Sequence, residues 1–103
     1  MNPTHSPPTL APAGVLQLAE AEEREGRPEE AERQYARAAS LAESQHDLRT
    51  LAIALKKLAV VAHHRNESAR GRELCRKSFG VAMAAGDFIL AGEASNVEAL
   101  IDF

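Results

Sequence analysis

Two neighbouring histidines and a nearby carboxylate are the residues whose types come closest to a metal site. His63 and His64 precede Glu67, and His63 and Glu67 have the i, i+4 spacing that shares one face of a helix. Asn66 is expected to end the helix between them, and no further His or Cys has ligand spacing. Histidines near the negative end of a helix dipole explain the pair more simply, so we predict no metal site.

Cys75 is the single cysteine, and the basic residues Arg72, Arg76 and Lys77 lie close to it. A reactive thiol needs exposure and a lowered pKa, which positive charges can provide. Cys75 takes the place of Tyr35 in the second copy of a repeating pattern, however, and this position predicts a buried, inert thiol. The sequence also lacks a glycine-rich phosphate loop and a recognisable nucleophile–base pair. We therefore predict that the chain is not an enzyme and needs no cofactor.

The composition favours an all-α domain. Of the 103 residues, 45% are hydrophobic but only 4% are aromatic, and much of the hydrophobic content is alanine. Alanine is the best helix former, whereas β-branched and aromatic residues favour strands. One cysteine cannot form an internal disulfide. The sequence shows no signal peptide and no apolar run near the roughly 20 residues that span a bilayer, so we expect a cytoplasmic protein without a membrane partner.

Charge alternates along the chain in three blocks. Residues 14–47 carry nine acids and four bases (−5), residues 48–80 two acids and eight bases (+6), and residues 81–103 four acids and no base (−4). The net charge of −3 gives no general attraction to nucleic acid. The basic segment also lacks aromatic residues that could stack on bases, so we predict a solvated face and no nucleic-acid partner. Attraction between successive blocks is expected to add modestly to their packing.

Turn signals divide the chain into a lead-in and five helices. Residues 1–13 are rich in proline and are expected to form a disordered lead-in. Gly26 and Gly86 favour the left-handed conformation that ends a helix, while Pro28 and Asp47 favour the start of the next one. The predicted helices span about 13–25, 28–45, 48–64, 67–85 and 88–102. The short turns predict antiparallel neighbours.

A pattern of small and large residues recurs at a fixed interval along the chain. Leu18-Ala19 returns as Leu58-Ala59, and the sequence positions of Gly26, Ala31, Tyr35 and Ala38 return as Asn66, Gly71, Cys75 and Ser78. Val97 comes one position before an exact third copy of Leu58 would, so we expect a third copy with a slip of one residue. The pattern predicts an α-solenoid of antiparallel helix pairs, with repeats at about 14–47 and 48–86 and an incomplete one at 87–103. The alternative is a HEAT-like array.

The first copy resembles a tetratricopeptide repeat, because its residues match the consensus positions of that family: Val15, Leu18, Ala19, Gly26, Ala31, Tyr35 and Ala38. The period of about 40 residues exceeds the usual 34 and resembles the longer variants of kinesin light chains and bacterial signalling proteins. The resemblance covers residues 14–103 and implies a scaffold that binds a protein or peptide on its concave face. The alternative is the N-terminal sensory or regulatory region of a longer bacterial signalling protein, such as a transcription regulator or a nucleotide cyclase.

In this family the first helix of each pair lines the concave groove. Transferred by position, the resemblance implies a partner-binding surface made of Leu16, Glu20, Glu23, Arg24, Ile53, Lys56, Lys57, Val60, His63, His64, Ser95, Asn96 and Ala99. The clamp with which chaperone-binding members hold a C-terminal carboxylate is absent, since its positions hold Leu16, Glu20, Lys57, Gly92 and Asn96. The last helix ends in Leu100-Ile101-Asp102-Phe103 without a covering helix. We expect that it either self-associates or continues into a longer repeat protein.

Overall fold

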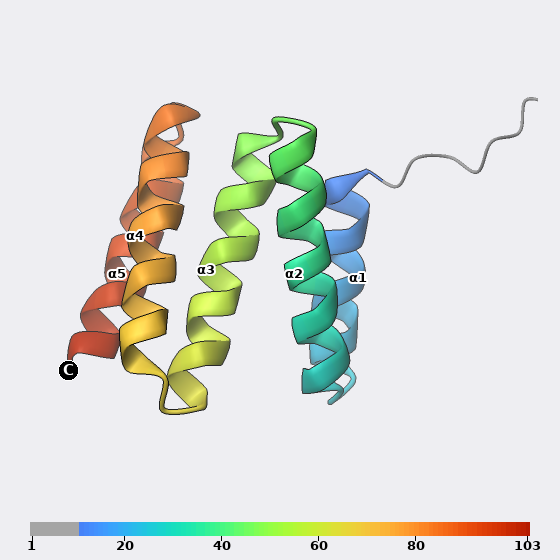
Figure 1. The fold of residues 1–103 in the computed structure, drawn as a ribbon, viewed down its shortest axis with the longest axis horizontal. Coiled ribbons are helices and arrows are strands. Elements are labelled where there is room, and N and C mark those ends of the chain that lie inside the picture. The colour runs from blue at the N-terminus through green and yellow to red at the C-terminus, as the bar shows by residue number, and fades with distance from the viewer. Residues whose placement is uncertain (1–10) are drawn as a thin grey trace, which may run out of the picture.

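The structure, a computed structural model, describes residues 11–103, which form five α-helices and no strand (Figure 1). The helices are α1 (Pro12–Arg24), α2 (Pro28–Ser44), α3 (Leu48–His64), α4 (Ser68–Ala84) and α5 (Phe88–Asp102). Successive helices run in opposite directions and lie side by side in adjacent pairs. The prediction of an all-α chain is confirmed, with every helix boundary within one residue. No helix among these residues has the length and apolarity needed to cross a membrane.

The predicted disordered lead-in lies largely outside the described residues. Helix α1 begins at Pro12, which fits the first turn of a helix because its missing N–H has no partner there. Pro12 and Ala13, the last two residues of the predicted lead-in, therefore belong to α1.

The four turns between helices repeat one conformation. Each has one residue with a positive φ: 77° at Gly26, 57° at His46, 63° at Asn66 and 74° at Gly86. The amide of the following residue donates to a carbonyl in the last turn of the preceding helix, as from Asp47 to Ala42 at 2.9 Å. This bond satisfies a carbonyl that the end of the helix leaves free. The turns are evenly spaced in sequence, so α2 to α5 begin at equal intervals.

This regular spacing keeps the copies in register along the whole chain. Helix α5 begins at Phe88 and α3 at Leu48, and their separation equals that between the turn residues Gly26 and Asn66. The predicted slip of one residue is therefore wrong. Asp47 and Asp87 cap these two helices in the same way, since their carboxylates accept hydrogen bonds from the amides of Thr50 at 3.2 Å and Leu90 at 3.0 Å.

Small residues allow the helices of each pair to approach closely. The first core cluster brings Ala19 and Ala38 together around the buried ring of Tyr35. In the second pair, Ser78 takes the position of Ala38, and its hydroxyl donates to the carbonyl of Ala52 at 2.6 Å. Cys75 takes the position of Tyr35 and is fully buried, as predicted. Its burial, with smaller effects from Glu98 and Asp102, raises the pKa of the thiol to about 11.

Leu18 and Leu58 are equivalent in sequence but differ in exposure. Leu58 is 8% exposed and belongs to the cluster around Tyr35, whereas Leu18 is 44% exposed. The difference arises because Leu58 packs against the preceding helix pair, while no helix precedes α1 within residues 11–103. An apolar residue at this position is therefore buried only where another pair comes before it.

The helices lie closer together on one side of the molecule than on the other. The backbone of α3 approaches both α1 and α5, whereas the backbones of α2 and α4 stay apart. The first helices of the pairs therefore lie on the inner side of a bend, and the second helices lie on its outer side.

Ion pairs join the oppositely charged blocks. All four acids of residues 81–103 bond to bases of the middle block, with Asp87 on Arg49 (3.1 Å), Glu93 on Lys56 (2.7 Å), Glu98 on Arg76 (2.8 Å) and Asp102 on Arg72 (3.6 Å). Glu32 of the first block bonds to Arg65 at 2.7 Å. The predicted attraction between blocks is confirmed, although exposed pairs contribute only about 0–1 kcal/mol each.

Candidate partner-binding surface

A pocket opens where the end of α1, the start of α2 and the end of α3 meet. Its volume is about 280 Å³. Apolar side chains line it together with polar ones, and the lining residues are Glu23, Pro28, Glu29, Ala31, Tyr35, Val60, Val61, His64 and Arg65. This volume is close to the lower end of the range for small-molecule sites, about 300–1,000 Å³. A pocket of this size can receive one side chain of a bound partner.

Tyr35 connects this pocket to the core. Its ring is buried, and its hydroxyl donates a hydrogen bond to Oε1 of Glu23. Burial, and then the hydrogen bond and charge of Glu23, raise the pKa of the Tyr35 phenol above its usual value. The phenol is therefore protonated at neutral pH and holds the Glu23 carboxylate of α1 against α2.

The polar residues of the pocket come from three helix ends. Glu29 lies in the first turn of α2, where the helix dipole favours a carboxylate. His64 ends α3 and is exposed, and Arg65, which follows it, is held by Glu32 of α2. Carboxylate and imidazole groups at this site can hydrogen-bond the backbone of an extended segment.

Three of the predicted binding residues line the pocket together, namely Glu23, Val60 and His64. On α1, Glu20 is half-buried and Arg24 is exposed. Leu16 is only 7% exposed and belongs to the core cluster around Tyr35. Its side chain therefore packs the helices together and is not available to a partner.

The other predicted residues of α3 are largely engaged inside the molecule. Lys56 bonds to Glu93, and only 18% of its side chain is exposed. Ile53 is half-buried against two of the core clusters, and Lys57 is also half-buried. His63 is half-buried, its Nδ1 has no hydrogen-bond partner among the described residues, and it does not line the pocket.

Ser95, Asn96 and Ala99 lie exposed on α5, away from the pocket. Ser95 and Ala99 correspond to Leu55 and Ala59, which are buried in the second helix pair. The expected slip of one residue had placed them on the inner side. The true register instead makes the exposed residues Leu100 and Phe103 the equivalents of Val60 and His63. The equal spacing of the turn residues along the sequence is the signal that identifies Leu100 and Phe103 as these equivalents.

No group of three or more His, Cys, Asp or Glu side chains within residues 11–103 is placed to hold a metal ion. His63 and Glu67 are separated by the end of α3 and by Asn66, whose φ is 63°. Asn66 therefore ends the helix between them, as the sequence predicts.

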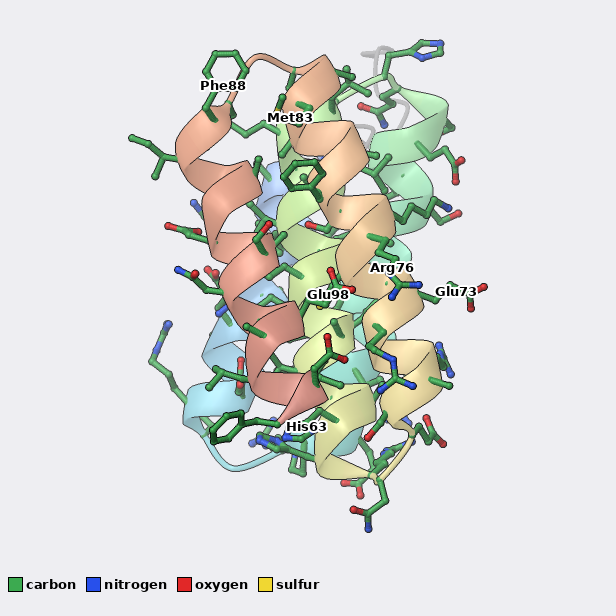
Figure 2. The ribbon with its side chains drawn as sticks, turned by 90° about the vertical axis from the view of Figure 1, so that its left-hand side faces the viewer. His63, Glu73, Arg76, Met83, Phe88 and Glu98 are labelled. Carbon is green, nitrogen blue, oxygen red and sulfur yellow. The ribbon has the colours of Figure 1, made fainter. Side chains whose placement is uncertain are left out.

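A second hollow, of about 520 Å³, lies on α4 and is lined by Ala69, Arg70, Arg72, Glu73 and Arg76. Figure 2 shows Glu73 pointing outward from α4 and Arg76 beside Glu98 of α5. Arg72 and Arg76 already bond to Asp102 and Glu98. Little unpaired positive charge is therefore left in this hollow for an anionic ligand.

Comparisons of the chain with protein-family models, with curated proteins and with solved structures return no match. The residues of the pocket and their geometry are therefore the basis for a functional assignment.

Proposed function

We propose that this chain is a protein-interaction module of the tetratricopeptide type, which binds a segment of a partner protein on the inner side of its bent row of helices. The observation that carries the proposal is the pocket between α1, α2 and α3. It brings together Glu23, Val60 and His64, three residues that the resemblance to tetratricopeptide repeats implies bind a partner.

The chemistry of the pocket favours a partner side chain that is apolar. Ala31, Tyr35, Val60 and Val61 provide an apolar lining, and such enclosed anchors carry most of the energy of protein–protein binding. Glu23 is already oriented by Tyr35, so its carboxylate can bind without a large loss of side-chain entropy. The lining thus supplies affinity, while the polar groups select the direction of the bound segment.

The pocket lies at a contact whose equivalent between α4 and α5 is made by different residues. Gly71 of α4 and Ile101 of α5 are equivalent to Ala31 of α2 and Val61 of α3. Cδ1 of Ile101 lies 3.0 Å from the point where a Cβ on Gly71 would lie. Ala31 carries the Cβ that Gly71 lacks, Val61 lacks one methylene of Ile101, and both Ala31 and Val61 line the pocket. We infer that the side chain of the partner enters beside these two residues.

A selection of random displayed peptides on the full chain tests the proposal. Enriched peptides should contain an apolar anchor and should bind Val60→Asp at least tenfold more weakly than the wild type, because the new carboxylate charges the pocket lining. Ala36→Asp is the matched control, since Ala36 is exposed on α2 and does not line the pocket. A selection that yields no binder, or binders that do not distinguish Val60→Asp from Ala36→Asp, contradicts the proposal.

A further inference from the structure

A stripe along the exposed side of α5 carries no charged residue, and the exposed acids Glu93 and Asp102 border it. Opposite the buried Leu90, Ala94 and Ile101, the helix presents Phe88, Ile89, Gly92, Ser95, Asn96, Ala99, Leu100 and Phe103. This uncharged face occurs in a chain of which 26% of the residues are charged. Ile89 is 81% exposed and Phe88 is 67% exposed. Several large apolar side chains exposed on one face are typical of an interaction site.

The corresponding face of α3 is covered in the second helix pair. Ala52 and Ala59 are fully buried there, whereas Gly92 and Ala99, their equivalents on α5, are exposed. A Cβ added to Gly92 would meet nothing within 4 Å. The face of α5 therefore has the small residues that allow another helix to approach closely, and no helix within residues 11–103 covers it.

The acids near this face are already neutralised. Glu93 bonds to Lys56, Glu98 bonds to Arg76, and Asp102 bonds to Arg72. Figure 2 shows Arg76 and Glu98 on facing sides of α4 and α5. Two copies of this surface can therefore meet without repulsion between unpaired carboxylates, although residues 81–103 contain four acids and no base.

Six of the eight residues on this face are arranged symmetrically about one midpoint, and Ile89 and Leu100 are the exceptions. The midpoint between Ser95 and Asn96 is also the midpoint between Gly92 and Ala99 and between Phe88 and Phe103. A two-fold axis at this midpoint would place small residues against small residues at the centre and rings near rings at both ends. Antiparallel helices also bring opposite ends of their dipoles together.

We propose that the chain forms a homodimer in which α5 packs antiparallel against the same helix of a second copy. In this dimer Phe88 lies beside Phe103 of the partner subunit, and Gly92 lies beside Ala99 of the partner subunit. The isologous contact closes at two copies because each helix presents the same self-complementary face. The inference does not depend on the proposed pocket, which lies at α1 to α3.

The aromatic residues of this face supply a large part of the area that a dimer interface needs. A standard interface buries roughly 800 Å² per partner, and a phenylalanine side chain can bury roughly 150–250 Å². Phe88 and Phe103 therefore supply on the order of 300–500 Å² per copy. Phe79 and Met83 of α4 are also exposed, and Figure 2 shows Met83 at the same end of the molecule as Phe88. They extend the apolar surface beyond α5.

Sedimentation velocity of the full chain, from low to high micromolar concentration, tests the dimer. We expect a monomer–dimer equilibrium that Ala99→Lys weakens at least tenfold, because the new ammonium lies beside Gly92 of the partner subunit. Ala36→Lys is the matched control, since it changes an exposed alanine of α2 and should leave the equilibrium unchanged. Circular dichroism verifies that both variants keep their helices.

A second pair of variants tests the antiparallel direction. Gly92→Glu alone should also weaken the dimer, and combining it with Ala99→Lys should restore at least part of the affinity, because the two opposite charges meet across the two-fold axis. Within one helix, positions 92 and 99 are two turns apart. An attraction between the two new charges in the same subunit therefore restores little of the dimer affinity. A chain that is monomeric at every concentration, a dimer insensitive to Ala99→Lys, or the absence of restoration would overturn the proposal.

Discussion

Cδ1 of Ile101 lies 3.0 Å from the point that a Cβ on Gly71 would occupy. Between α2 and α3 the equivalent residues are Ala31 and Val61, which both line the pocket. In the second copy, glycine replaces alanine on α4 and isoleucine replaces valine on α5. The smaller residue therefore faces the larger one. The two residues share one limited space, so their effects on stability should be coupled.

Exchanging this pair for the residues of the first copy tests the coupling. Gly71→Ala should cost about 1 kcal/mol, because crowding of Ile101 and of the Ala59 carbonyl, at 3.2 Å, outweighs the higher helix propensity of alanine. Ile101→Val should also cost about 1 kcal/mol. In urea denaturation the double variant should be more stable than the sum of the single effects by about 1 kcal/mol. Additivity of the two substitutions would show that they do not share this space.

The positive φ at His46 predicts a stabilising substitution. A side chain in the left-handed region costs roughly 1–2 kcal/mol, and glycine avoids this cost. We expect His46→Gly to raise the free energy of unfolding by about 1 kcal/mol, and Asn66→Gly to raise it less, because asparagine tolerates this conformation better.

Thermal and urea denaturation measure the effect of these glycine substitutions. Gln45→Gly is the matched control, since Gln45 has a φ of −101° in the same turn and gains nothing from glycine. If Gln45→Gly and His46→Gly lose the same free energy of unfolding, the result would contradict the positive φ at His46.

The cap of α5 predicts a pH dependence. The hydrogen bond from the Leu90 amide, and to a smaller degree Arg49, hold the pKa of Asp87 below its usual value. A carboxyl group with a lowered folded-state pKa stabilises the fold above its unfolded pKa of about 3.9. This stabilisation is lost as the pH falls through the folded-state pKa.

Asp87→Asn isolates this contribution, because asparagine still caps a helix but carries no charge. The variant should be less stable than the wild type at pH 7, and the difference should shrink as the pH falls below about 4. Urea denaturation at a series of pH values measures this difference. A difference that stays constant between neutral and acidic pH would mean that the charge of Asp87 does not contribute.

The buried Cys75 predicts a thiol that does not react in the folded protein. Its full burial and a pKa of about 11 leave little thiolate at pH 8 and no access for a reagent. Labelling with an aromatic disulfide should therefore be slow in buffer and fast in denaturant. Ser40→Cys adds a thiol at an exposed position of α2, and one of its two thiols should label at once. Rapid labelling of native wild-type protein would contradict the burial of Cys75.

Much of the helical pattern could be predicted because its signals are local. Gly26, Asp47 and Gly86 mark helix ends through backbone conformation and capping, which do not depend on distant residues. His46 gives no such signal, because histidine seldom adopts a positive φ. Only the position of its turn midway between those at Gly26 and Asn66 identifies it.

The binding surface was harder to predict because exposure depends on neighbouring helices. Leu16 and Leu18 are both apolar residues of α1, and the resemblance to tetratricopeptide repeats implies that Leu18 lies inside and Leu16 on the surface. The structure has the opposite arrangement, since no preceding pair covers Leu18 within residues 11–103. Matching apolar Val97 to Leu58 wrongly predicts that Ser95 and Ala99 lie on the inner side.

The affinity of a selected peptide for Val61→Ile tests the central claim most directly. The extra methylene should extend into the pocket beside Ala31 and weaken the peptide at least tenfold in isothermal titration calorimetry. Crowding against Ala31, like that of Ile101 against a Cβ on Gly71, should lower stability by about 1 kcal/mol. Val97→Ile makes the same chemical change on α5, outside the pocket, and should leave the affinity unchanged. An affinity for Val61→Ile equal to that of the wild type would contradict the claim that a partner side chain occupies the pocket.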